Sequence, residues 1–128
     1  MDLLGDDHLL LSRLIYTLGS LMYSCLNAPA ATQIAKNLLE FLWVVRYHPQ
    51  QSVRQSVLYA CSMVLVATPS HSIVADLTAQ ATELKLWLTE VVNKDADEEC
   101  QKRALQALFL LENCVKKVML NRIYSMEI

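Results

Sequence analysis

Glycine and proline, the residues that build tight turns and long loops, are scarce in this sequence. Only two glycines and three prolines occur among its 128 residues. Charged residues make up 19%, below the usual ~25%, whereas hydrophobic residues make up 54%. So little turn material favours an all-α fold over hairpins of strands, and the length suffices for one domain.

The sequence also lacks a basic stripe and a long apolar run. Its net charge is −2, and lysine and arginine are scattered singly except at residues 102–103 and 116–117. We therefore expect no direct nucleic acid binding. The apolar run at residues 57–67 is much shorter than the ~20 residues that cross a bilayer, so we expect no membrane span.

No metal-binding or catalytic motif is present. A structural zinc site needs two close ligand pairs, but the four cysteines lie far apart, so we expect reduced thiols in an intracellular compartment. The acidic run at residues 95–99 lacks the central glycine of a calcium loop, and His71 has no nucleophile motif beside it. We predict no enzyme activity, no catalytic, metal-binding or cofactor-binding residue, and no cofactor.

What the sequence does contain is an internal repeat. Residues 48–61 and 95–108 align at a constant offset, since 95 − 48 = 47 and 108 − 61 = 47. A two-helix unit that recurs every ~40–47 residues is typical of HEAT and armadillo repeats. Such units stack into an α-solenoid because none can bury its apolar face alone. The aligned pairs are Val53 with Cys100, Val57 with Ala104, Leu58 with Leu105, and Ala60 with Ala107.

The repeat predicts a single helical-repeat domain over residues 1–128. We expect about five helices: two stacked hairpins and a leading helix. The third helix, from residue 51 to 66, is apolar nearly all round and should pack on both sides. Residues 78–82 of the predicted fourth helix are small and polar, which is compatible with a bend or a local break in that helix. The predicted segments are a leading helix (1–27), a first repeat (28–68), a second repeat (69–118) and a tail (119–128), which is either frayed or a docking segment.

Each helix carries a stripe of apolar residues at helical spacing. In the fifth helix this stripe is predicted to bury Leu105, Phe109 and Val115. The leading helix holds more apolar residues than one face can bury, so part of it should be exposed and covered by neighbouring repeats, a partner or self-association. We expect the isolated chain to dimerise, and Leu10→Glu or Met22→Lys to relieve this. The predicted exposed residues are Leu10, Tyr16, Met22 and Tyr23.

Arg54 and Asp95 allow two interpretations. HEAT units often pair such an arginine with an aspartate, yet neither copy of the repeat carries both partners. The two residues are either ordinary solvated charges or a bridge between the repeats, worth about 0–1 kcal/mol if exposed. The inner helices of solenoids contact partners, and the predicted partner-binding residues are Gln55, Tyr59, Lys102, Gln106 and Asn113.

Residues 84–100 and 103–112 resemble the C-terminal region of the telomere length regulation protein family, and residues 53–57 and 1–5 fit the same region. The resemblance implies a HEAT-repeat subunit of the Triple-T co-chaperone complex, which works with heat-shock chaperones to stabilise phosphatidylinositol-3-kinase-related kinases. It also implies a C-terminal part of a longer protein. The implied partners are the other helical-repeat subunits and the client kinases. The expected location is the cytoplasm, with the nucleus as an additional alternative.

The sequence as a whole therefore predicts a non-enzymatic protein-binding scaffold. The alternative is a small helical enzyme or ligand carrier that uses a pocket between helices. A ligand that stabilises the chain would favour the alternative.

Overall fold

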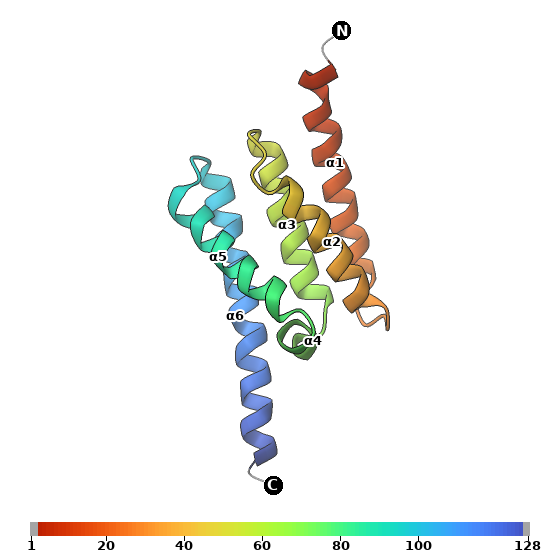
Figure 1. The fold of residues 1–128 in the computed structure, drawn as a ribbon, viewed down its shortest axis with the longest axis vertical. Helices are drawn as coiled ribbons and strands as arrows, with labels where there is room; N and C mark the ends of the chain where they lie inside the picture. Colours follow the sequence, from red (N-terminus) through yellow and green to blue (C-terminus); the bar gives the residue numbers. More distant parts are fainter. Residues whose placement is uncertain (1–2, 127–128) are drawn as a thin grey trace.

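The computed structural model describes residues 3–126, and over this range the chain forms six helices and no strand (Figure 1). The all-α class is confirmed. Residues 1–2 of the predicted leading helix and residues 127–128 of the predicted tail lie outside the described range. The helices are α1 (Leu3–Ser24), α2 (Ala31–Val45), α3 (Gln51–Ala67), α4 (Ser70–Ala75), α5 (Thr78–Lys94) and α6 (Glu98–Met126).

The helices form two layers. Figure 1 shows α1, α3 and α6 side by side in a row, with α2 and α5 crossing over them. The row is held by contacts of α3 with α1 on one side and with α6 on the other, while α2 packs on α3 and α5 on α6. The central helix α3 is therefore covered on both sides, as its nearly uniform apolar character predicts. The arrangement is consistent with a helical solenoid.

Local chemistry explains where the helices end. Asn27 follows α1 with a φ of 68°, a left-handed conformation that asparagine tolerates better than most residues. Thr68 ends α3 in an extended conformation (ψ 133°), as expected for the residue before a proline. No described helix is long and apolar enough to cross a membrane.

The predicted fourth helix is two helices, α4 and α5, so the number is six rather than five. At the break, the amide of Leu77 donates to the carbonyl of Ser72, 3.0 Å away and five residues back. The hydroxyl of Thr78 donates to the carbonyl of Val74 at 2.5 Å. This side-chain bond competes with the regular helical pattern, and the wider turn directs Leu77 into the core.

The two outer helices meet through their tryptophans. Trp43 on α2 and Trp87 on α5 lie edge to face, with ring centroids 5.9 Å apart and planes at 72°. Trp87 is buried and Trp43 half-buried. Such aromatic pairs stabilise beyond simple burial, so this contact fixes α2 against α5.

The inner row is close-packed at Gly19. A Cβ atom at this position would lie 2.9 Å from Cε1 of Tyr59 and 3.1 Å from the Cα of Ala60. Only glycine therefore lets α1 approach α3 this closely. The repeat offset holds for three of the four aligned pairs, because Val53, Val57 and Ala60 of α3 are buried like their aligned residues on α6, Cys100, Ala104 and Ala107. It fails for the fourth pair, since Leu58 is buried and Leu105 is exposed.

Candidate protein-binding surfaces

The Arg54 guanidinium and the Asp95 carboxylate join two helical hairpins, one formed by α2 and α3 and the other by α5 and α6. Nε of Arg54 lies 2.9 Å from Oδ2 of Asp95, and Nη2 lies 3.1 Å from Oδ1. Nη1 donates to the carbonyls of His48 and Pro49 at 3.0 and 2.8 Å. The hydrogen bond to Asp95 raises the pKa of Arg54. Both side chains are largely buried, so this is a bidentate bridge between α3 and the α5–α6 turn rather than a pair of solvated charges.

Asp97 continues this junction at the start of α6. Its Oδ2 accepts the backbone amide of Cys100 at 3.0 Å and Nε2 of Gln55 at 2.9 Å. It thus caps the helix and ties it to α3. The hydrogen bond from Gln55 lowers the pKa of Asp97. Gln55, a predicted partner contact, is therefore already engaged within the chain.

Arg103 links all three helices of the inner row. Its Nη1 donates to the hydroxyl of Tyr16 on α1 and to the carbonyl of Gln55 on α3, 3.1 Å away. Its Nε pairs with Glu99 at 2.9 Å. Tyr16 in turn stacks on Tyr59, with ring centroids 5.1 Å apart. The apolar periodicity of α6 gives no sign of this role. The 47-residue offset does, because it aligns Arg103 with the buried Ser56, a position where a charge needs partners.

The predicted partner contacts thus fall into two groups. Gln55 and Tyr59 are half-buried and bonded inside the chain, since the Tyr59 hydroxyl lies 3.0 Å from Oγ of Ser20. The other three are exposed on α6, namely Lys102, Gln106 and Asn113. Tyr59 and Gln106 share a groove of about 740 Å³ between α3 and α6, whereas Lys102 and Asn113 do not line it.

At the α1 end of the row, three leucines on one helical face are exposed. Leu10, Leu14 and Leu21 are 66%, 51% and 56% exposed. Their spacing places them together on a face of α1 beside the one that carries Ile15 and Met22, which are buried. The prediction that Met22 is exposed is therefore wrong: it follows Ile15 by seven residues and packs on the same buried face. Leu10 and Tyr23 are exposed as expected, whereas Tyr16 is half-buried under Arg103.

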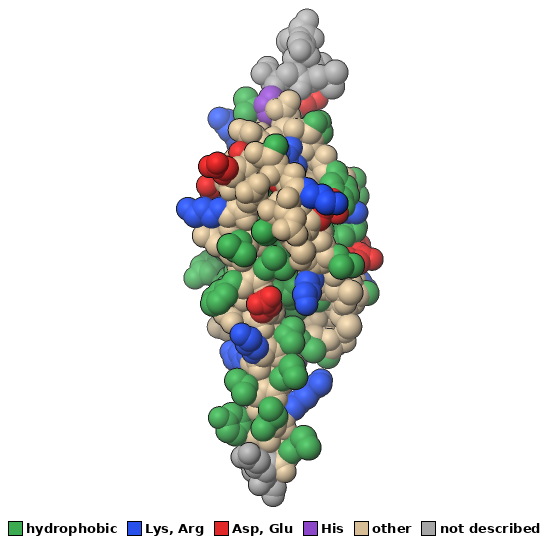
Figure 2. Space-filling model, turned by 90° about the vertical axis from the view of Figure 1, so that its left-hand side faces the viewer, with side chains coloured by type: hydrophobic (Ala, Val, Ile, Leu, Met, Phe, Trp, Pro, Cys, Tyr) green, Lys and Arg blue, Asp and Glu red, His purple; other side chains and the backbone are tan. Residues whose placement is uncertain are grey.

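At the α6 end of the row, a second apolar face is exposed. Leu105 and Phe109 are 60% and 64% exposed, and Val115 is also open to solvent, so the prediction that they are buried is wrong. The reason is that α6 carries two apolar stripes, and small residues such as Cys100, Ala104 and Ala107 fill the one that faces α3 and α5. Figure 2 looks onto this end and shows hydrophobic side chains with acidic and basic ones among them.

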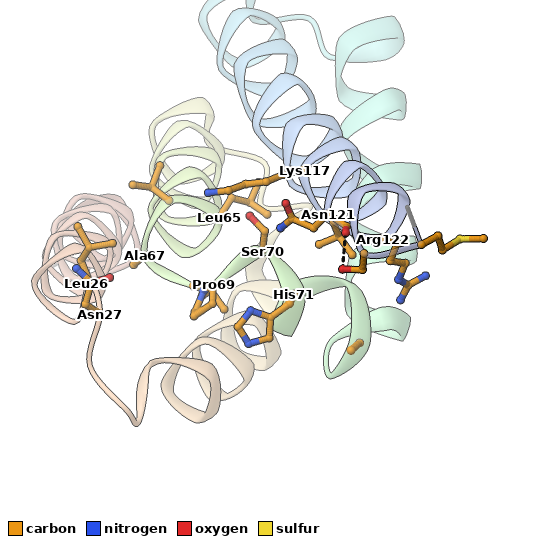
Figure 3. A pocket seen from close by; sticks show the side chains of 16 residues that line it. Leu26, Asn27, Leu65, Ala67, Pro69, Ser70, His71, Lys117, Asn121 and Arg122 are labelled. Carbon is orange, nitrogen blue, oxygen red and sulfur yellow. Dashed lines mark hydrogen bonds between the residues drawn. The ribbon is translucent and has the colours of Figure 1, made fainter. Parts of the chain in front are cut away.

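A groove of about 870 Å³ lies between the α3–α4 turn and the C-terminal half of α6 (Figure 3). Lys117 and Arg122 project from α6 on one side, and Pro69 and His71 lie on the other. None of its lining residues carries a carboxylate, so the groove is suited to an anionic rather than a cationic ligand. Among the described residues, no group of acidic, histidine or cysteine side chains could hold a metal ion.

The cysteines are all free thiols. Burial raises the pKa of Cys61 and of Cys100 to about 12, so both stay protonated and unreactive at neutral pH. Cys25 is half-buried, and its Sγ lies 3.4 Å from the carbonyl of Leu21. Cys61 and Cys100 therefore contribute to the packing of the core.

Comparison with known proteins gives one consistent result. The chain is 46% identical over 111 residues to the telomere length regulation protein TEL2 homolog of Xenopus tropicalis. It is 44% and 42% identical over 118 residues to the homologs of Mus musculus and Homo sapiens. These matches cover 87–92% of the chain but only 13–14% of the relatives. No family model matches the chain, and no solved structure shows significant similarity to it. The family resemblance indicated by the sequence is confirmed.

Proposed function

Because this chain is homologous to telomere length regulation proteins over about nine tenths of its length, we propose that it is a non-enzymatic protein-binding module of such a protein. The finer role follows from the family resemblance: a subunit of the Triple-T co-chaperone complex that helps to stabilise phosphatidylinositol-3-kinase-related kinases. The module would act in the cytoplasm, with the nucleus as a second, alternative location. Residues 28–68 and 69–118 would be its two repeats, after a leading helix (1–27) and before a tail (119–128).

The observation that carries this proposal is the exposed leucine face of α1, formed by Leu10, Leu14 and Leu21. Monomeric proteins rarely leave contiguous apolar surface open unless it binds something. The central helix of the row, α3, is covered on both sides, by α1 and by α6, whereas this face of α1 has no helix packed on it in the described structure. A helix of another helical-repeat subunit, packed on α1 as α1 packs on α3, is the occupant that this face fits.

Affinity purification from cells tests the proposal. The wild-type chain should recover the helical-repeat subunits of the complex and a client kinase, and Leu10→Glu with Leu14→Glu should abolish the recovery. Val44→Glu is the control, because Val44 is 84% exposed on α2, away from this face. Loss of recovery with the control, or equal recovery with all variants, would count against the proposal.

The rival function is a ligand carrier or small enzyme. The groove beside Lys117 and Arg122 favours it, since two cations over an apolar floor suit a small anionic molecule. A thermal-shift screen of anionic metabolites separates the two functions. A rise of several degrees, lost in Lys117→Ala with Arg122→Ala, would support the carrier.

A further inference from the structure

The outward face of α6 carries a regular stripe of side chains that nothing in the described structure covers. Its six members recur with an average spacing of 3.6 residues, the period of an α-helix. They therefore lie in one line, about 27 Å long at ~1.5 Å per residue. The stripe, hereafter the α6 stripe, consists of Leu105, Phe109, Glu112, Lys116, Leu120 and Ile123, all of them exposed.

The α6 stripe is not a copy of the contact that α3 makes with α6. At the 47-residue offset Leu105 aligns with Leu58, which is fully buried against its neighbours. Glu112, however, aligns with the buried Leu65, so a charge stands where the repeat contact has a leucine. An occupant of the α6 stripe must therefore supply opposite charges at its centre as well as apolar groups at both ends.

The order of residues in the α6 stripe is symmetric about position 114. Positions that sum to 228 face each other when two copies of the helix run antiparallel around that point. Leu105 then meets Ile123 of the other copy, since 105 + 123 = 228, and Glu112 meets Lys116, since 112 + 116 = 228. Phe109 lies level with Leu120 to within one residue. Each copy thus offers the other an apolar contact at each end and two opposite charges in the middle.

We infer that the α6 stripe binds a second copy of this chain in an antiparallel, twofold-symmetric dimer. Twofold contacts use the same surface on both partners and are the commonest form of self-association. Within residues 3–126 neither Glu112 nor Lys116 forms a salt bridge, so both charges are available to the other copy. The C-terminal half of α6 extends beyond α4 and α5 (Figure 1), which leaves the surface open to a second helix.

This inference is independent of the proposed function, which concerns α1 at the opposite end of the row. A single helix face is a small interface, so a reversible, weak dimer is expected. Sedimentation velocity of the 128-residue chain over a concentration range of about three decades should show it. Phe109→Ser should weaken the dimer about tenfold or more, because large aromatic side chains buried on association dominate such interfaces. Leu10→Ser is the matched control, because it alters the exposed face of α1 through which the sequence predicted dimerisation. If the α6 stripe forms the dimer instead, Leu10→Ser should leave the dimer unchanged.

Charge exchange tests the antiparallel register. Glu112→Lys and Lys116→Glu should each weaken the dimer about tenfold at low salt. In either variant, both pairs between residue 112 of one copy and residue 116 of the other change from opposite to like charges. A mixture of the two variants should form mixed dimers again, since one stripe then carries only positive and the other only negative charge. Lys117→Glu makes the same charge change one residue away, off the α6 stripe, and should have no effect.

Several outcomes would overturn the inference. These are a monomeric wild-type chain at the highest concentration, a dimer that Leu10→Ser weakens and Phe109→Ser does not, and charge variants whose mixture stays monomeric. Circular dichroism of each variant shows that a lost dimer does not reflect a lost fold. Loss of partner recovery in cells with an intact dimer would reject the proposed function alone.

Discussion

Tyr16 and Arg103 are separated by 87 positions in the sequence, yet the Arg103 guanidinium donates a hydrogen bond to the Tyr16 hydroxyl. The contact joins α1 to α6, the two ends of the inner row, whereas the main helix contacts of the row join neighbours only. It also places a cation 5.7 Å from the Tyr16 ring centroid. A polar contact on one side of the row therefore connects its two end helices directly.

Tyr16→Phe should destabilise the chain by about 1 kcal/mol, because a partly buried hydrogen bond to a charged group is lost. The ring and its contact with Tyr59 remain, so the effect isolates the hydroxyl. Urea unfolding followed by circular dichroism measures it. Tyr23→Phe is the control, since Tyr23 is exposed. Equal stability of both variants would show that the contact contributes nothing.

Gly19→Ala should also destabilise the fold. The new methyl group would meet the Tyr59 ring at 2.9 Å and the Ala60 backbone at 3.1 Å, and overpacking of this kind costs about 1–3 kcal/mol. The better helix propensity of alanine offsets about 1 kcal/mol of this. A net loss of about 1 kcal/mol is expected in thermal or urea unfolding. Thr17→Ala on the exposed side of α1 should change little, and a stabilising Gly19→Ala would contradict the close approach.

The sequence predicted the layers of this fold better than its surfaces. The 47-residue offset correctly paired Val53 with Cys100 and Val57 with Ala104, because both copies bury these positions against a neighbouring helix. Apolar periodicity does not distinguish the buried stripe of α6 from the exposed one, so it wrongly predicts that Leu105 and Phe109 are buried. Whether a stripe is buried depends on whether a neighbour is present, and that information is not local in sequence.

The Arg54–Asp95 bridge should couple the two hairpins energetically. A double-mutant cycle of Arg54→Gln and Asp95→Asn is expected to give a coupling of about 2 kcal/mol, the range for hydrogen bonds to charged groups. An exposed pair would give about 0–1 kcal/mol. The cycle is measured by urea unfolding at neutral pH. A coupling near zero would mean that the bidentate geometry is not maintained in solution.

Asp97 should make stability depend on pH in the acid range. Its folded pKa lies below the ordinary value of 3.8, so the charged form stabilises the fold above about pH 4, and this contribution is lost as the pH falls through the folded pKa. Asp97→Ala should cost about 1 kcal/mol at neutral pH through loss of the helix cap. Asp97→Asn can still cap the helix but cannot titrate. The stability difference between wild type and Asp97→Asn should therefore shrink on acidification, and a constant difference would contradict the assignment.

Thiol accessibility follows from burial. In the native chain an alkylating reagent should modify Cys25 first, while Cys61 and Cys100 react slowly because burial raises their pKa to about 12 and keeps them protonated. Mass spectrometry after brief treatment measures the order. In guanidinium chloride the cysteines should react alike. Rapid native modification of Cys61 would show that the contact between α3 and its neighbours opens readily.

The edge-to-face tryptophan pair gives the protein a built-in optical reporter. Trp43 and Trp87 are the only two tryptophans in the chain, and they belong to the outer helices of different hairpins. Two indoles this close couple their excited states, so the near-ultraviolet dichroism of the unlabelled protein depends on their separation and tilt. A partner that bends one hairpin against the other would change this signal without any dye, whereas one that binds a single end of the row would leave it intact.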